Sequence, residues 1–186
     1  MDKYRLASDD ELVRCFVNSD IKAFETIVLK YQKPIINFIY RIIGNFQEAE
    51  DIAQEAFMKL YCSAYTYEGH SSFTTWLFKI ASNLSCDRLR VRSHWDCVPI
   101  DAIRDGLQGK LLSPQELVES SELTQFIETA IGRLAIQQRQ ALVLREYCGF
   151  SYTEIAEVAD CSVSAIKSRI HKAKQKLRKE LSFILD

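Results

Sequence analysis

Glycine and proline are scarce in this chain, with six and three among 186 residues. Alternating polar and apolar runs, which are typical of half-buried β-strands, are hard to find. Apolar residues instead recur with the period of a helix from one end of the chain to the other. We therefore expect a nearly all-helical protein, and its 47% hydrophobic residues are enough to form a buried core.

Long apolar runs are also missing. None reaches the length of about twenty residues that a membrane-spanning helix needs. The most apolar segment, 34–43, is interrupted by Asn37 and Arg41, and residues 1–5 lack the apolar stretch of a signal peptide. We expect a cytoplasmic protein with no membrane insertion.

The sequence lacks the motifs of an enzyme. His70, His94 and His171 lie far apart, and neither a nucleophile motif nor a glycine-rich phosphate loop is present. We predict no catalytic residues and no cofactor.

Paired cysteines are absent as well. The six cysteines form no CxxC pair, so we expect reduced and mostly buried thiols. Cys86, His94 and Cys97 lie within twelve residues, but the paired spacing of a zinc site is missing and no fourth ligand is evident. We predict no metal site and leave a redox or metal response of these three residues open.

The helical periodicity divides the chain into two parts. Segment 93–113 contains Pro99, Gly106 and Gly109 with sparse apolar residues, and we interpret it as a flexible linker. It separates two small helical domains, 1–92 and 114–186. The predicted helices are 9–17, 21–43, 45–64, 72–91, 114–134, 137–148, 152–159 and 162–183.

The formal net charge of the chain is only −1, but segment 162–179 is strongly basic. It contains seven Lys and Arg residues and no acidic residue. Before it, Ser151 and Glu154 form a capping box that starts a short helix, and Ser162 caps the next. Two such helices joined by a tight turn predict a helix-turn-helix motif.

The second helix of this motif has two faces. Its apolar face packs on the first helix and consists of Ile166, Ile170, Ala173 and Leu177. Its polar face suits base edges in a major groove, with cations for phosphates at its flanks: Ser164, Ser168, His171, Lys172 and Gln175, flanked by Lys167, Arg169 and Lys176. Lys174, Arg178 and Lys179 are interpreted as solvated surface residues.

The predicted helix 45–64 is amphipathic in another way. Its buried face consists of Ile52, Ala53, Ala56, Phe57 and Leu60, and its outward face of Asp51, Gln54, Glu55 and Met58. An acidic face with an exposed methionine repels nucleic acid and suits a protein partner. An ordinary solvated helix face is an equally good interpretation from composition alone.

Helix 72–91 and the loop before it combine aromatic, amide and cationic groups, which suit unstacked single-stranded bases. Tyr65 and Tyr67 lie in the loop, whereas Trp76 is expected to belong to the core. The apolar stripe of this helix consists of Phe73, Trp76, Leu77, Ile80 and Leu84. The other side of the helix carries Lys79, Ser82 and Asn83, and its C-terminal end carries the basic residues Arg88, Arg90 and Arg92.

Several stretches, in the right order from about residue 8 to 181, resemble the extracytoplasmic function (ECF) sigma factors, most closely the sigma-E type. They are DIAQEAF at 51–57 (region 2.2), FTTWLFKIASN at 73–83 (regions 2.3 and 2.4), and LREYCGFSYTEIA at 144–156 with SVSAIKSR at 162–169 (region 4). The resemblance implies an all-α chain of a region 2 domain, a linker and a region 4 domain. It also implies a dissociable initiation factor that directs core RNA polymerase to specific promoters in a stress or environmental response.

The resemblance assigns three sets of contacts. It implies that Asp51, Gln54 and Glu55 bind the clamp helices of the polymerase β′ subunit, and we predict that Met58 joins them. It implies that Asn83 and the loop around Tyr67 bind the minus-ten element, and we predict that Lys79 and Arg88 do so as well. For the minus-thirty-five element it implies Arg145, Lys167, Ser168, Arg169, His171 and Lys172. The β flap and an anti-sigma factor are the other implied partners.

The recognition helix departs from the family pattern. Ser164 and Ala165 stand where relatives commonly have Gly-Thr, and Lys167 and His171 replace what is often Arg and an aromatic residue. The promoter sequence therefore does not carry over.

A stand-alone helix-turn-helix regulator is the alternative. Its N-terminal half would dimerise or sense a ligand. Substituting Asp51, Gln54 and Glu55 would leave DNA binding by such a regulator intact, but it would abolish a polymerase complex.

Overall fold

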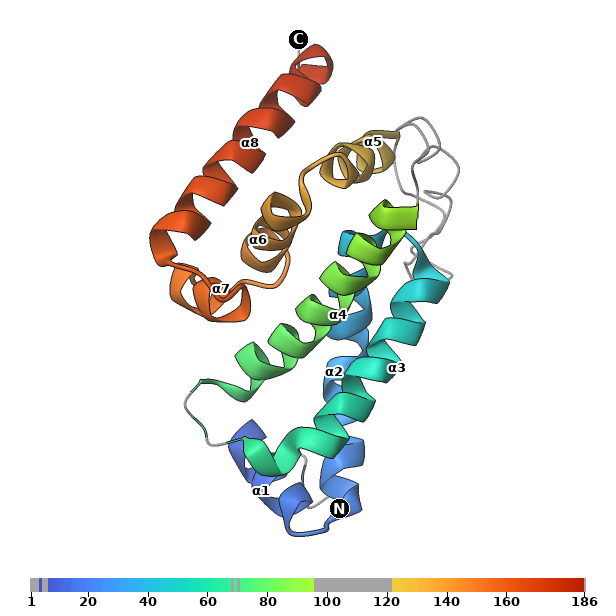
Figure 1. Cartoon of the computed structure of the whole chain (residues 1–186), viewed down its shortest axis with the longest axis vertical. Coiled ribbons are helices and arrows are strands. Elements are labelled where there is room, and N and C mark those ends of the chain that lie inside the picture. Colours follow the sequence, from blue (N-terminus) through green and yellow to red (C-terminus); the bar gives the residue numbers. More distant parts are fainter. Residues whose placement is uncertain (1–3, 5–6, 68, 70, 96–121, 186) are drawn as a thin grey trace.

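The computed structural model describes residues 4, 7–67, 69, 71–95 and 122–185. Within these ranges the regular structure is entirely helical, which confirms the expected fold class (Figure 1). The elements are α1 (Asp9–Val17), α2 (Ile21–Ile43), α3 (Phe46–Ser63), a short 3₁₀ helix η1 (Ala64–Thr66), α4 (Phe73–Trp95), α5 (Glu122–Gly132), α6 (Ile136–Glu146), α7 (Tyr152–Val158) and α8 (Val163–Leu185). The bounds of α1 and α2 are those that the sequence predicts.

The predicted linker, 93–113, begins inside α4, which continues to Trp95. The start of the linker was therefore placed too early. Its remainder, and the first residues of the helix expected at 114–134, lie outside the described residues.

Side-chain caps set the starts of the N-terminal helices. Ser8 and Glu11 form a capping box at α1, in which the Ser8 N–H donates to the Glu11 carboxylate at 2.8 Å. The side chains of Asp20 and Asn45 cap α2 and α3. Gly44 ends α2 with a φ of 80°, a left-handed conformation that favours glycine.

In the N-terminal half, α2, α3 and α4 pack along one another, and α1 covers one end (Figure 1). The apolar face predicted for α3 is buried throughout: Ile52, Ala53, Ala56, Phe57 and Leu60. This face belongs to the same core cluster as Ile35, Ile39 and Leu77, which are fully buried. Burial on this scale, at about 1.5–3 kcal/mol for each large side chain, is the main stabilising contribution to the half.

The C-terminal half contains the predicted helix-turn-helix. Ser151 and Glu154 form the expected capping box of α7, and Ser162 Oγ accepts from the Ala165 N–H at 3.2 Å at the start of α8. Between them, Asp160 turns the chain with a φ of 50°. Ile166, Ile170 and Ala173 are buried as predicted, and Leu177 is half-buried.

The two halves, which the sequence predicts as separate domains, are in contact. In Figure 1, α7 lies against α4, and α5 and α6 lie beside α2. One hydrophobic core cluster runs through both halves. The Phe78 ring on α4 and the Phe150 ring before α7 are 4.9 Å apart at their centroids. We call the whole contact between the two halves the seam.

Candidate functional site

The recognition helix α8 exposes most of the residues that the sequence assigns to DNA. Lys167, Ser168, His171 and Lys172 are exposed, while the opposite side of the helix is buried against α6 and α7. Arg169 differs, because it is half-buried and its guanidinium donates to Cys161 Sγ at 3.4 Å. The helix therefore presents a polar and basic strip on a rigid support.

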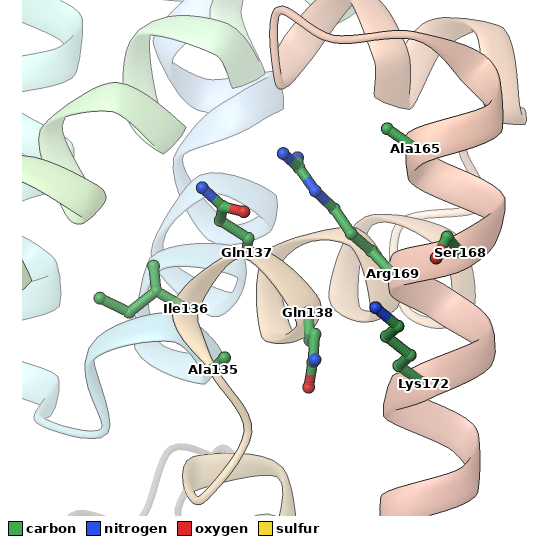
Figure 2. A pocket seen from close by; sticks show the side chains of 8 residues that line it. All are labelled: Ala135, Ile136, Gln137, Gln138, Ala165, Ser168, Arg169 and Lys172. Atoms are coloured by element: carbon green, nitrogen blue, oxygen red, sulfur yellow. The ribbon is translucent and has the colours of Figure 1, made fainter.

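A hollow of about 380 Å³ lies between α8 and the N-terminus of α6. Figure 2 shows the Arg169 and Lys172 side chains reaching from α8 toward Gln137 and Gln138 across this hollow. The cations of α8 therefore fall into two groups. Arg169 and Lys172 face α6, whereas Lys167 does not line the hollow.

Two lysines farther along α8 are held by the protein itself. Lys174 forms an ion pair with Glu146 at 2.8 Å, and Lys176 Nζ donates to the Arg133 carbonyl at 2.5 Å. The placement of Lys174 outside the DNA-facing set agrees with its interpretation as a surface residue. Lys176 was expected to be a flanking cation for phosphates, but its ammonium group is hydrogen-bonded to the carbonyl of Arg133, the residue that follows α5.

Arg145, at the end of α6, supports the turn into α7. Its guanidinium donates to the Phe150 carbonyl at 2.8 Å and lies 4.9 Å from the centroid of the Tyr152 ring. Part of the Arg145 guanidinium therefore stabilises the turn between α6 and α7 within the protein. The signal that could have indicated this is the set of aromatic residues in the next seven positions, Tyr147, Phe150 and Tyr152.

The outward face of α3 is as predicted. Asp51, Gln54 and Met58 are exposed, with Met58 at 69%, and Glu55 is half-buried in an ion pair with Lys59 at 3.6 Å.

Sequence reasoning missed an aromatic extension of this surface. Tyr61, one turn beyond Phe57 on α3, is half exposed and contacts Phe16 and Phe24, with ring centroids 5.1 and 5.2 Å away. Tyr65 is exposed a further turn along. The spacing of these tyrosines after Met58 is the signal that could have been used.

The basic end of α4 is less positive than the sequence suggests. Glu48 on α3 lies 3.5 Å from Arg88 and 3.9 Å from Arg92, so that one carboxylate serves two guanidinium groups. Arg90 pairs with Asp87 at 3.0 Å. Asn83 is exposed and Lys79 is half-buried, so both side chains have access to solvent.

Tyr67 lies in a network rather than on an open loop. Its ring stacks on Trp76, with centroids 5.1 Å apart and 29° between the planes. Its hydroxyl lies 3.0 Å from the Asp10 carboxylate and 2.9 Å from the Ser71 carbonyl, both acceptors. Burial, with the Asp10 contact, raises the pKa of Tyr67 to about 12. Trp76 contacts Phe73 as well, which agrees with its assignment to the core.

Ser82 was expected beside Lys79 and Asn83 on the polar side of α4, and this was wrong. Its exposed fraction is 1%. Its hydroxyl accepts a hydrogen bond from Gln140 Nε2. The partner lies 58 residues away, so no local pattern could have indicated the contact.

The cysteines are free but not mostly buried. Of the five in the described ranges, Cys62 is exposed and the others are half-buried. The side chains of His94 and Cys97 lie outside the described residues, and the part of the chain that is described contains no cluster of three or more metal-ligating side chains. Burial raises the pKa of Cys86.

No helix in the described part of the chain is long and apolar enough to cross a membrane.

Two family models match the chain, each on one half. Sigma-70 region 2 matches residues 27–94, and Sigma-70, region 4 matches residues 126–177. The chain belongs to the sigma-70 family. Both halves of this sigma factor are therefore accounted for, and the alternative of a stand-alone helix-turn-helix regulator is not supported.

The relatives identify this sigma factor as a member of the ECF group. The RNA polymerase sigma-H factor of Pseudomonas aeruginosa is 36% identical over 184 residues, which cover 95% of each chain. The ECF RNA polymerase sigma factor SigW of Bacillus subtilis is 36% identical over 87% of this chain and 90% of SigW. The sigma factor RpoE of Bartonella quintana, solved with the anti-sigma factor NepR, is 27% identical with a TM-score of 0.70, covering 87% of this chain and 98% of that one.

Proposed function

We propose that this sigma factor directs core RNA polymerase to a limited set of promoters and performs no covalent chemistry. The observation that carries the proposal is the separation of two surfaces of opposite character. α8 exposes Lys167, Ser168, His171 and Lys172, whereas α3 exposes Asp51, Gln54 and Met58. A chain that must hold DNA and a protein together needs both surfaces.

The polymerase contact is assigned to the outward face of α3. Asp51, Gln54 and Glu55 offer carboxylate and amide groups, and Met58 adds an adaptable apolar contact. Their acidic character favours a basic or polar protein surface over DNA. We assign this face to the β′ clamp helices and the C-terminal half to the β flap.

Recognition of the duplex is assigned to α8. Lys167, Ser168 and His171 lie on its exposed strip and reach base edges in the major groove. Arg169 and Lys172 face the hollow beside α6 and hold phosphates, together with Arg145 at the end of α6. These are the minus-thirty-five contacts.

Binding of the melted minus-ten strand is assigned to α4 and the loop before it. Asn83 provides an exposed amide for a base edge, and Lys79 and Arg88 provide charge. Tyr67 offers an edge of its ring to a base while its other contacts hold the loop in place. Binding of unpaired bases offsets the stacking that is lost when DNA opens.

Regulation and location follow from the same assignment. A solved relative, RpoE of Bartonella quintana, is bound by an anti-sigma factor, and we expect a partner of this kind here. A protein that works on chromosomal promoters resides in the cytoplasm. A stress or environmental response is the setting that this regulation suits.

The test is a transcription assay with purified core polymerase and genomic DNA of the encoding organism. We expect discrete start sites that share an upstream motif and depend on the added protein. The double variant Asp51→Ala, Gln54→Ala should lose both these starts and co-purification with core, whereas Gln32→Ala, at an exposed position on α2, should keep them. Specific DNA binding by the chain alone, with no effect of the double variant, would contradict the proposal.

A further inference from the structure

The first turn of α1 carries two neighbouring acids, Asp9 and Asp10. The Asp9 carboxylate accepts a hydrogen bond of 2.6 Å from the hydroxyl of Tyr31 on α2. The Asp10 carboxylate lies 3.0 Å from the hydroxyl of Tyr67, which follows η1. The partners are 22 and 57 residues away in the sequence. A single turn of α1 therefore contacts two separate elements through two tyrosine hydroxyls.

The contact at Asp9 continues into the first turn of α4. The Tyr31 hydroxyl has one proton, which it donates to Asp9, and it lies 3.1 Å from the Thr74 hydroxyl. Thr74 is therefore the donor in the second bond, and a chain of hydrogen bonds runs from α4 through α2 to α1. The other Asp9 oxygen accepts from Lys30 Nζ at 2.6 Å. Burial, with the Asp9 bond, raises the pKa of Tyr31, so the hydroxyl keeps its proton.

The contact at Asp10 holds an aromatic ring beside the proposed minus-ten contacts. Tyr67 stacks on Trp76, with ring centroids 5.1 Å apart. Lys79 and Asn83 follow Trp76 by one and two helical turns, so the three side chains lie along one side of α4. The Tyr67 ring therefore borders the side of α4 that is assigned to the melted strand.

The placement of Asp10 is unfavourable for DNA binding by charge alone. Its carboxylate is exposed, and a negative charge beside a DNA-binding surface repels phosphates. What it provides is an acceptor for the Tyr67 hydroxyl, which also lies 2.9 Å from the Ser71 carbonyl, two residues before α4. The hydroxyl thus connects α1 with the backbone that leads into α4.

We propose that Asp9 and Asp10 are positioning residues for the minus-ten strand, which fix the start of α4 and the ring beside it through Tyr31 and Tyr67. This inference rests on the proposed function, in which α4 binds unpaired bases. A surface that is already held in its binding arrangement loses less conformational freedom when a ligand binds. The match to Sigma-70 region 2 begins at residue 27, so α1 lies outside it. We assign α1 a part in strand binding that requires no contact with a base.

The experiment measures binding of the melted strand by the reconstituted holoenzyme. The probe is a fluorescent single-stranded oligonucleotide with the minus-ten motif that the mapped start sites define. Asp10→Asn and Asp10→Ala remove the same charge, but only the amide keeps an acceptor for the Tyr67 hydroxyl. We expect Asp10→Ala to bind the oligonucleotide about fivefold more weakly than Asp10→Asn, and the same difference between Asp9→Ala and Asp9→Asn. Equal affinities within both pairs would overturn the proposal.

Two further readouts distinguish positioning from a general loss of the fold. Binding of a duplex that contains the minus-thirty-five element alone, and co-purification with core, should agree within about twofold among all four variants. A parallel loss in these two readouts would overturn the positioning role. Glu25→Gln and Glu25→Ala, at an exposed acid on α2, are the matched control pair and should bind the oligonucleotide equally.

A double substitution tests the route through Tyr67. In the Tyr67→Phe background the hydroxyl is absent, so Asp10→Asn and Asp10→Ala should no longer differ. A fivefold difference that persists there would show that Asp10 acts independently of Tyr67, against the proposal. If the wild type gives no specific starts, the proposed function fails. If it gives starts and binds the oligonucleotide, but the variants within each pair are equal, only the positioning role fails.

Discussion

Lys172 and Lys174 lie two residues apart on α8 but differ in their surroundings. Lys172 faces the hollow beside α6, whereas Lys174 is paired with Glu146 at 2.8 Å. We expect Lys172→Ala to weaken holoenzyme binding at all cognate promoters to a similar degree and to reduce the slope of log affinity against log salt by about 1. Lys174→Ala should leave that slope unchanged. The measurement is promoter binding by the reconstituted holoenzyme at several salt concentrations, and equal slopes for both variants would contradict the assignment.

Tyr67 gives a second prediction for a single residue. Tyr67→Phe removes the hydroxyl that contacts Asp10 and Ser71, and we expect it to lower the free energy of unfolding by about 1 kcal/mol. Tyr65→Phe, at an exposed ring, is the matched control and should change stability by less than about 0.5 kcal/mol. Denaturant unfolding monitored by circular dichroism measures both.

The pH dependence of the Tyr67 contribution has a defined sign. The pKa of Tyr67 is raised to about 12, above the ordinary value of 10, so the unfolded chain loses this proton first. The stabilisation is complete below pH 10 and is lost as the pH rises toward 12. The stability difference between wild type and Tyr67→Phe should therefore shrink across this window. A constant difference would show that the hydroxyl titrates normally.

Among the helices, α7 depends most on its cap because it has only seven residues. Ser151→Ala removes the acceptor of the Glu154 N–H and should destabilise the protein by about 1 kcal/mol. The Glu154 carboxylate in turn accepts from Ser151, and these bonds, first the one to the Ser151 side chain and then the one to its backbone N–H, lower the pKa of Glu154. The stabilisation by the carboxylate bonds is therefore lost as the pH falls below 4.5. Gln175→Ala on the exposed side of α8 is the control. Equal thermal midpoints for the two variants at neutral pH would contradict this role for Ser151.

Helices were largely predictable from the sequence because their signals are local. Ser151 and Glu154 are three residues apart, and the buried face of α3 repeats with the helical period. The candidate site was predictable to the same extent: exposure of Asp51 and His171 follows from the wheel. Burial of Ser82 and engagement of Arg139 were not predictable, because their partners lie 58 and 97 residues away.

At the scale of the whole molecule, Arg139 joins elements that the sequence separates. Its guanidinium donates to the carbonyls of Gly132 and Leu134 at the corner between α5 and α6, and to Ile42 across the seam. Burial lowers the pKa of Arg139. Arg139→Ala leaves three carbonyls without this donor and should cost about 3 kcal/mol of stability.

We expect Arg139→Lys to lose stability as well, because an ammonium group lacks the planar guanidinium geometry that reaches several carbonyls at once. Arg133→Ala, which removes an exposed guanidinium 3.8 Å from Glu180, is the control and should cost less than about 1 kcal/mol. Chemical denaturation of the full chain measures all three variants. Full stability of Arg139→Lys would show that the charge alone is sufficient.

The position of Arg139 also limits how this sigma factor can diverge. Because one side chain serves both the interior of the C-terminal half and its contact with α2, a change there alters the stability of this half and that contact together. Gln140, one residue later, touches the other half through Ser82 and is free of the corner that Arg139 holds. Among descendants of this gene, inherited changes in the contact between the two halves should therefore arise at Gln140 and Ser82, while Arg139 stays invariant.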